Sequence, residues 1–223
     1  MDERIVAFQG FLLQRFPALK DIAHTYKFCS KFSQNRYLVQ CEKKTINFDK
    51  LTEWYRPNPR PCSADSLSFS DLSLFLIEFK SGDPTLHIDH INKEDLLIKS
   101  VVGKIKDSYA TLTDLYREAF RSTGIRLKEK FCIVVDTASM GISVYSSILT
   151  NLSTKNNDNL TPKEKAIFER ILPQIQNSIK DSCDNFDIMI WYSDLFEHYL
   201  KRFKIQNCRV PRHSNIIVFE AEE

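Results

Sequence analysis

The chain has 223 residues, of which 31 are Lys or Arg and 29 are Asp or Glu, so its formal charge is +2. A hydrophobic content of 43% in a chain of this length is enough for a buried core, which excludes a protein that is disordered throughout. The near-neutral charge also excludes a strongly basic surface over the whole molecule. The six cysteines include no Cys-x-x-Cys pair, so the sequence favours buried, reduced thiols over a structural zinc site.

Neither a signal peptide nor a membrane-spanning segment is expected. The first residues, Met1-Asp2-Glu3-Arg4, do not form a basic segment followed by an apolar one. No apolar run approaches the ~20 residues that a spanning helix requires. We therefore expect a cytoplasmic protein that does not contact a membrane.

The N-terminal part is predicted to contain one long helix followed by two short strands. Apolar residues recur at helical spacing between residues 2 and 27, and Pro17 is expected to bend or divide this helix. Residues 36–41 and 45–48 are strand candidates that can pair with each other. Alternating prolines in residues 56–61 exclude helix and sheet there, so this segment is an extended connection.

A β-hairpin is predicted next, over residues 65–80. Residues 65, 67 and 69 share one face of the first strand, and three serines occupy the other face. A tight turn near Ser70-Asp71 leads into the apolar run 74–80, which Ser-Gly-Asp-Pro at 81–84 ends. Two such strands joined by a short turn form a hairpin.

The remaining elements alternate between helix and strand, and their expected positions can be given in chain order. A long amphipathic helix runs from Asn92 to Gly124, and a strand buried on both faces follows at 131–135. After an Asn- and Ser-rich loop at 153–160, Thr161-Pro162 begins a helix. Later come a strand at 186–191, a short helix at 193–202 and a last strand at 216–219. This order predicts a single α/β (α+β) domain over 1–223, in which helices flank a mixed central sheet.

The hairpin also carries residues that can bind a metal or take part in catalysis. Glu78 and Lys80 are two apart on one strand, so their side chains point to the same face. Asp65 begins the partner strand, and in an antiparallel pair the start of the first strand lies opposite the end of the second. Two carboxylates can hold Mg²⁺, and a nearby lysine can orient water or stabilise negative charge. We therefore expect Asp65, Glu78 and Lys80 to converge in one site.

Asp65 followed by Leu-Phe-Leu-Ile-Glu-Phe-Lys at 74–80 resembles the signature of the PD-(D/E)xK nuclease superfamily. The predicted order of elements over residues 1–136 is similar to its restriction-endonuclease-like αβββαβ core, with 137–223 as a C-terminal α/β extension. The resemblance implies Mg²⁺-dependent hydrolysis of phosphodiester bonds, with Mn²⁺ as an alternative metal. It also implies that Asp65 and Glu78 are catalytic metal ligands and that Lys80 is a catalytic, water-positioning base.

The chain departs from that signature in several places. Ala64 precedes Asp65 where the signature has proline. Many members of the superfamily add a metal-binding glutamate from the first helix, and here Glu3, very near the terminus, is the only glutamate available there. Asp71 competes with Asp65 as the first acid, although it lies in the turn. The acid-x-lysine pattern alone is weak, because Glu42-Lys43-Lys44 also satisfies it.

Each of these residues also has a purely structural interpretation. Asp65 can cap a turn, and Glu78 with Lys80 can form a charge pair on a half-exposed sheet. On the helix after the hairpin, Lys99, Lys104 and Lys106 can bind the phosphates of nucleic acid or form a solvated face.

Two classes of function follow from these observations. The first is a metal-dependent nuclease acting on nucleic acid, most plausibly DNA. The second is a protein that keeps the nuclease fold without catalysis and acts as a nucleic-acid-binding or protein-interaction module. Nucleases that cut both strands of a duplex often act as dimers, so a homodimer is compatible with the first class.

Overall fold

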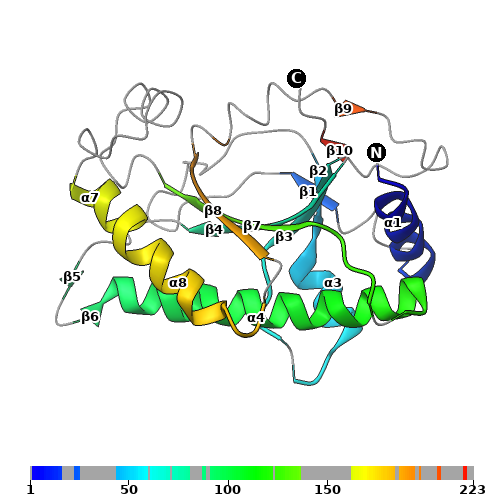
Figure 1. Ribbon diagram of the computed structural model, residues 1–223, viewed down its shortest axis with the longest axis horizontal. Coiled ribbons are helices and arrows are strands. Elements are labelled where there is room, and N and C mark those ends of the chain that lie inside the picture. Colours follow the sequence, from blue (N-terminus) through cyan, green and yellow to red (C-terminus); the bar gives the residue numbers. More distant parts are fainter. Residues whose placement is uncertain are drawn as a thin grey trace.

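The computed structural model describes the following residues: 2–16, 23–25, 44–59, 61–70, 72–80, 87–88, 91–122, 124–136, 162–183, 186–193, 196, 205–206 and 218–219. The predicted strand at 36–41, the loop at 153–160 and nearly all of the predicted helix at 193–202 lie outside these residues. The fold is α+β, with a mixed sheet flanked by helices (Figure 1).

Eight strands of the described residues form one mixed sheet. Six of them lie side by side in the order β1 (Ala23–Thr25), β2 (Lys44–Asn47), β3 (Ser66–Ser70), β4 (Leu74–Lys80), β7 (Glu129–Val135) and β8 (Phe186–Tyr192). β10 (Val218–Phe219) pairs in parallel with β3 and antiparallel with β9 (Ile205–Gln206). β5 (His87–Ile88) and β6 (Ile91–Asn92) form a separate short ribbon. Residues after 137 therefore add strands to both the β7 side and the β3 side of one sheet.

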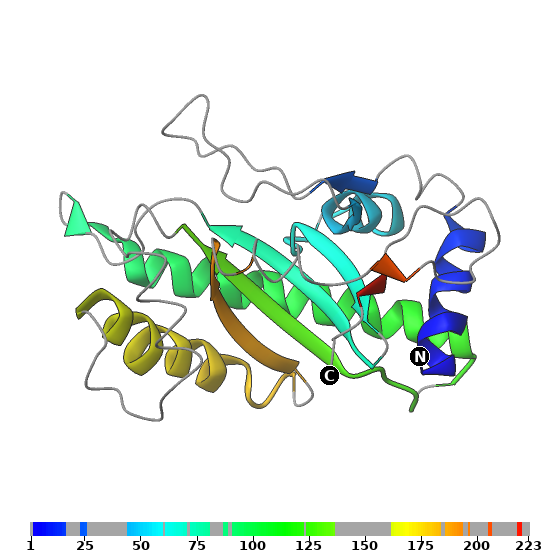
Figure 2. The same cartoon turned by 90° about the horizontal axis from the view of Figure 1, so that it is seen from above.

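The longest described helix, α4 (Lys93–Phe120), runs along one face of this sheet (Figures 1 and 2). α1 (Glu3–Arg15) and α8 (Leu172–Ile179) pack near opposite ends of α4. Among the described helices, none combines the length and the apolar composition needed to cross a lipid bilayer.

The first helix is shorter than predicted. α1 ends at Arg15, and Phe16 has a non-helical backbone with φ −129° and ψ 78°. Pro17 explains this end, because the residue before a proline is pushed out of the helical region. Ala23–Thr25, which was predicted to be helical, forms strand β1 instead.

The helix α3 (Phe48–Tyr55) was not predicted at all. The strand expected at 45–48 is confirmed as Lys44–Asn47, but the chain turns into α3 at Phe48. The Asn47 side chain caps the helix by accepting a hydrogen bond of 2.9 Å from the Lys50 backbone N–H. Asparagine is a favoured capping residue, so this start was visible in the sequence.

The hairpin prediction is confirmed. β3 and β4 are antiparallel, with Ser66 opposite Ile77 and Phe69 opposite Leu74. The serine face of β3 is not solvated, however, because Ser66 and Ser68 are buried. β7 lies between β4 and β8, parallel to both, and is almost wholly buried as predicted.

The helix predicted from Thr161-Pro162 begins at Pro162 and changes type along its length. α7 (Pro162–Lys165) continues into a π-helix at Ala166–Ile171 and then into α8. Pro173 lies at the start of α8 and has no backbone N–H to donate to the preceding turn. The Leu172 N–H bonds the Ile167 carbonyl five residues back, which is the π pattern.

Candidate functional site

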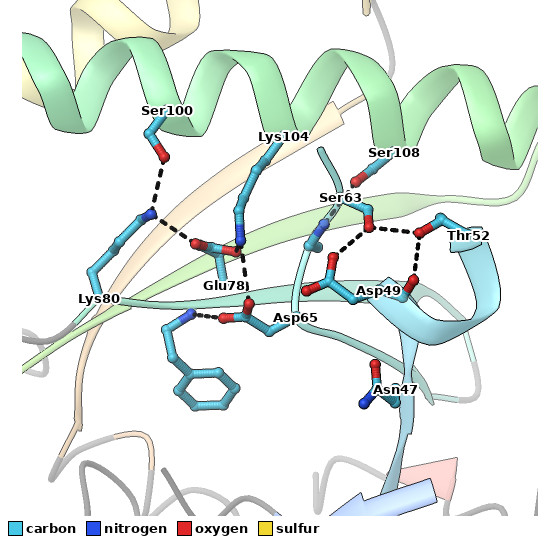
Figure 3. Close-up of polar contacts among 12 residues, drawn as sticks. Asn47, Asp49, Thr52, Ser63, Asp65, Glu78, Lys80, Ser100, Lys104 and Ser108 are labelled. Carbon is cyan, nitrogen blue, oxygen red and sulfur yellow. Dashed lines mark hydrogen bonds and ion pairs between the residues drawn. The ribbon is translucent and has the colours of Figure 1, made fainter. Parts of the chain in front are cut away.

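Asp65, Glu78 and Lys80 lie in one polar cluster between β4 and α4 (Figure 3). The Lys80 ammonium is 2.8 Å from Glu78 Oε1. A second lysine, Lys104 from α4, lies 2.7 Å from Glu78 Oε2 and 3.2 Å from Asp65 Oδ1. Because one nitrogen contacts both acids, these two carboxylate oxygens lie less than about 6 Å apart. The predicted convergence of the three residues is therefore observed.

The strand register brings the two acids together. Ser66 is opposite Ile77, so Asp65, one residue earlier, lies beside Glu78, one residue later. Asp65 Oδ2 also accepts a hydrogen bond of 2.8 Å from the Phe79 backbone N–H. Glu78 and Lys80 extend the row of β4 side chains that starts with the buried Leu74 and Leu76. The site is thus the polar end of an otherwise apolar face.

The chain segment before Asp65 is hydrogen-bonded to α4. The Cys62 N–H donates to Asp107 Oδ2 at 2.8 Å, and the Ala64 N–H donates to Ser108 Oγ at 3.0 Å. On the other side, the Phe48 N–H at the start of α3 donates to the Asp65 carbonyl at 3.2 Å. Asp65 is therefore positioned from both α3 and α4, although it precedes the first residue of β3.

The three helix lysines do not form one row. Lys104 faces the sheet, while Lys99 and Lys106 are exposed on α4. Seven residues are close to two helical turns, so Lys99 and Lys106 lie on the same side and Lys104 lies well away from them. Contact of Lys99 and Lys106 with phosphates stays a prediction, and Lys104 has two carboxylate partners that the sequence did not reveal.

Sequence reasoning also missed a third acid near the cluster, Asp49 on α3. Asp49 Oδ1 accepts a hydrogen bond of 2.5 Å from Ser63 Oγ, which in turn lies 2.7 Å from Thr52 Oγ1 (Figure 3). The charge of Asp49 acts on Lys104. The signal that could have found it is the capped helix start at Asn47, which places an acid in the first turn of α3.

Burial and the charges of oppositely charged neighbours act in opposite directions on the pKa of Glu78 and on that of Lys104. Glu78 is 1% exposed, and burial, followed by the charge of Asp65, raises the pKa of its carboxyl above the ordinary value of 4.5. The charges of Lys80 and Lys104 lower that pKa without cancelling the rise. Burial by itself would lower the pKa of Lys104, but the charges of Glu78 and Asp65 raise it overall, so this lysine stays protonated.

Glu78 should therefore make folding stability depend on pH in a defined direction. Its pKa is higher in the folded state, so the folded protein holds this proton more tightly than the unfolded chain. The contribution of Glu78 to the free energy of unfolding therefore falls as pH rises from about 4.5 through the raised pKa. Urea denaturation of the parent and Glu78→Gln across this range should show the parent losing stability relative to the variant. A parent that gains on the variant as pH rises would contradict the assignment.

The cap of α3 should matter for the site as well as for stability. Asn47→Ala removes the acceptor for the Lys50 N–H and should cost about 1 kcal/mol in urea denaturation. The backbone N–H of the next residue, Phe48, donates a hydrogen bond to the Asp65 carbonyl, so any activity of the site should fall too. Asp2→Ala is the matched control, since Asp2 caps α1 by accepting from the Arg4 N–H at 2.9 Å. It should cost a similar free energy and leave activity unchanged; equal activity in both variants would refute the link between α3 and Asp65.

Two carboxylates meet here, and their chemistry fits a magnesium ion that keeps several waters. The described residues contain no group of three or more His, Cys, Asp or Glu side chains able to hold a metal. Glu3, the only glutamate of the predicted first helix, is exposed on α1, which packs through Phe8 against Phe69 at the far end of β3. Among the described residues of this cluster, Asp65 and Glu78 are the acids that could hold such an ion.

Comparisons with protein-family models, curated proteins and solved structures found no match for this chain. The function is therefore inferred from the chemistry of the cluster.

Proposed function

We propose that this protein is a metal-dependent nuclease that hydrolyses phosphodiester bonds in nucleic acid, most plausibly DNA. The observation that carries the proposal is the convergence of Asp65, Glu78 and Lys80: Lys80 pairs with Glu78, and the Lys104 ammonium contacts both Glu78 and Asp65. Acidic oxygens and a lysine at the end of an apolar sheet face are the groups that phosphoryl hydrolysis needs.

Each residue has a distinct task in this proposal. Asp65 and Glu78 would hold Mg²⁺ or Mn²⁺, whose carboxylate preference they match. When bound, the metal would lower the pKa of water and offset the negative charge that develops on the phosphodiester. Lys80 would orient the attacking water and stabilise that charge as a cation. Water then adds to phosphorus and one P–O ester bond breaks, leaving a phosphate monoester and a hydroxyl group.

The arrangement of elements gives this proposal further support. The described elements α1, β2, β3, β4, α4 and β7 follow one another in the order α-β-β-β-α-β. The short strand β1, the helix α3 and the β5–β6 ribbon are inserted between them. β2, β3 and β4 are successive antiparallel neighbours, and β7 joins β4 in parallel after the α4 crossover. We propose that this is the restriction-endonuclease-like core of the PD-(D/E)xK superfamily.

One observation favours the second candidate, a nuclease fold that binds without catalysis. Lys104 contacts both acids, so Asp65, Glu78, Lys80 and Lys104 form a set with no net charge. A neutral set attracts a divalent cation less than a bare pair of acids does. In that case the protein would bind nucleic acid or another protein and would cleave nothing.

The deciding experiment is a cleavage assay on labelled single- and double-stranded DNA and RNA, with Mg²⁺, Mn²⁺ or EDTA. Lys80→Ala is compared with Lys128→Ala, a matched control whose exposed side chain lies at the opposite end of the β4–β7 pair. We expect metal-dependent cleavage that falls by about 10²-fold or more in Lys80→Ala. Lys128→Ala should behave like the parent.

If the folded protein cleaves none of these substrates, the proposed nuclease activity is refuted and the binding module is favoured. A gel-shift assay with the same nucleic acids would then test that second function. Cleavage that survives Lys80→Ala unchanged would show that a different site is responsible.

A further inference from the structure

Lys104 occupies the position from which a single cation can satisfy both acids at once. Its ammonium donates to Glu78 Oε2 at 2.7 Å and to Asp65 Oδ1 at 3.2 Å. The lysine side chain is only 16% exposed, and that of Glu78 is 2% exposed, so little water screens their attraction. The contact is therefore a largely buried ion pair with short distances, unlike the solvent-screened ion pairs of the exposed surface.

The two oxygens that Lys104 binds belong to the carboxylates proposed as metal ligands. A divalent cation bound to these acids would be drawn to the same pair of oxygens as the Lys104 ammonium. The two cations repel each other strongly at such short range. Lys80 occupies neither of these two oxygens, because it binds the other oxygen of Glu78, Oε1, and also donates to Ser100 Oγ at 3.2 Å.

We propose that Lys104 is an internal counter-ion that competes with divalent metal for Asp65 and Glu78, and so sets the metal concentration that the site needs. This inference rests on the proposed function for its metal. Lys104 is a positioning residue in this role: it keeps the two acids together without metal and must withdraw from them when metal binds. Its long, flexible stem on α4 allows that withdrawal without movement of the helix.

The test measures metal binding directly, without nucleic acid. Isothermal titration with Mn²⁺ compares the parent with Lys104→Met, which removes the charge and keeps most of the apolar stem. Lys104→Gln is a second neutral variant that can still donate a hydrogen bond to Glu78, in case the first does not fold. Lys104→Arg keeps the charge and is the matched control.

We expect the Mn²⁺ Kd to fall by about tenfold or more in both neutral variants and to stay at or above the parent value in Lys104→Arg. The rise in Tm on adding Mn²⁺ should be larger in the neutral variants for the same reason. Adding Glu78→Gln to Lys104→Met should abolish the gain, which assigns it to this pair of acids.

Folded neutral variants that bind Mn²⁺ no more tightly than the parent would overturn the competition. If the parent nevertheless shows metal-dependent cleavage, the proposed nuclease stands and only the role of Lys104 fails. Tighter Mn²⁺ binding in the neutral variants, with no cleavage by any form, would support the counter-ion and refute the nuclease.

Discussion

Replacing Glu78 by glutamine should reduce metal-dependent cleavage by about 10²–10³-fold. Glu78 is the most buried member of the cluster and binds both lysines through its two oxygens. Glutamine keeps the shape and an acceptor oxygen but removes the negative charge that a divalent cation requires. Loss of several kcal/mol of transition-state stabilisation by metal corresponds to that range of rates. Initial rates on labelled nucleic acid at saturating Mg²⁺ would measure it.

The matched control for this variant is Glu169→Gln, which changes an exposed acid on the π-helix in the same way. It should cleave like the parent, and circular dichroism should show both variants folded. Higher Mn²⁺ concentrations should restore little activity to Glu78→Gln, because the variant lacks the carboxylate that we propose as a metal ligand. A Glu78→Gln protein that retains full metal-dependent activity would exclude Glu78 as a metal ligand.

Truncating Phe8 to alanine should produce the largest loss of stability among the substitutions considered. Phe8 is fully buried on α1, and its ring lies 4.7 Å from the ring of Tyr116 on α4, centroid to centroid. It also contacts the rings of Phe11, Phe69 and Phe120, so it joins the first helix to both the sheet and α4. Removing such a ring typically costs about 3–5 kcal/mol, which urea denaturation would measure.

Val6→Ala on the same helix is the control for this substitution. Val6 is 43% exposed, so its truncation should change the free energy of unfolding by no more than about 0.5 kcal/mol. A loss below about 1 kcal/mol for Phe8→Ala would mean that α1 contributes little to the core.

Local sequence patterns determined much of this fold. The alternation in 65–70 and the apolar run in 74–80 predicted the hairpin, and because antiparallel neighbours pair through a short turn, they also predicted that Asp65 lies near Glu78. The uninterrupted apolar run at 131–135 predicted a strand covered on both faces, and β7 has β4 and β8 on either side. The proline at 162 predicted the start of a helix. These features depend on residues close together in the chain.

The tertiary structure decided what depends on distant residues. Helical periodicity could not show that Ala23–Thr25 forms a strand, because that strand exists through its pairing with the distant residues of β2. Lys104 looked like its neighbours Lys99 and Lys106 in the sequence; its role was decided when α4 packed across the hairpin and brought it to acids 39 and 26 residues away. The sequence by itself thus determined which acids could meet, because strand register is local. Only the packing of α4 decided which cation meets them, because that contact depends on how a helix and a sheet lie against each other.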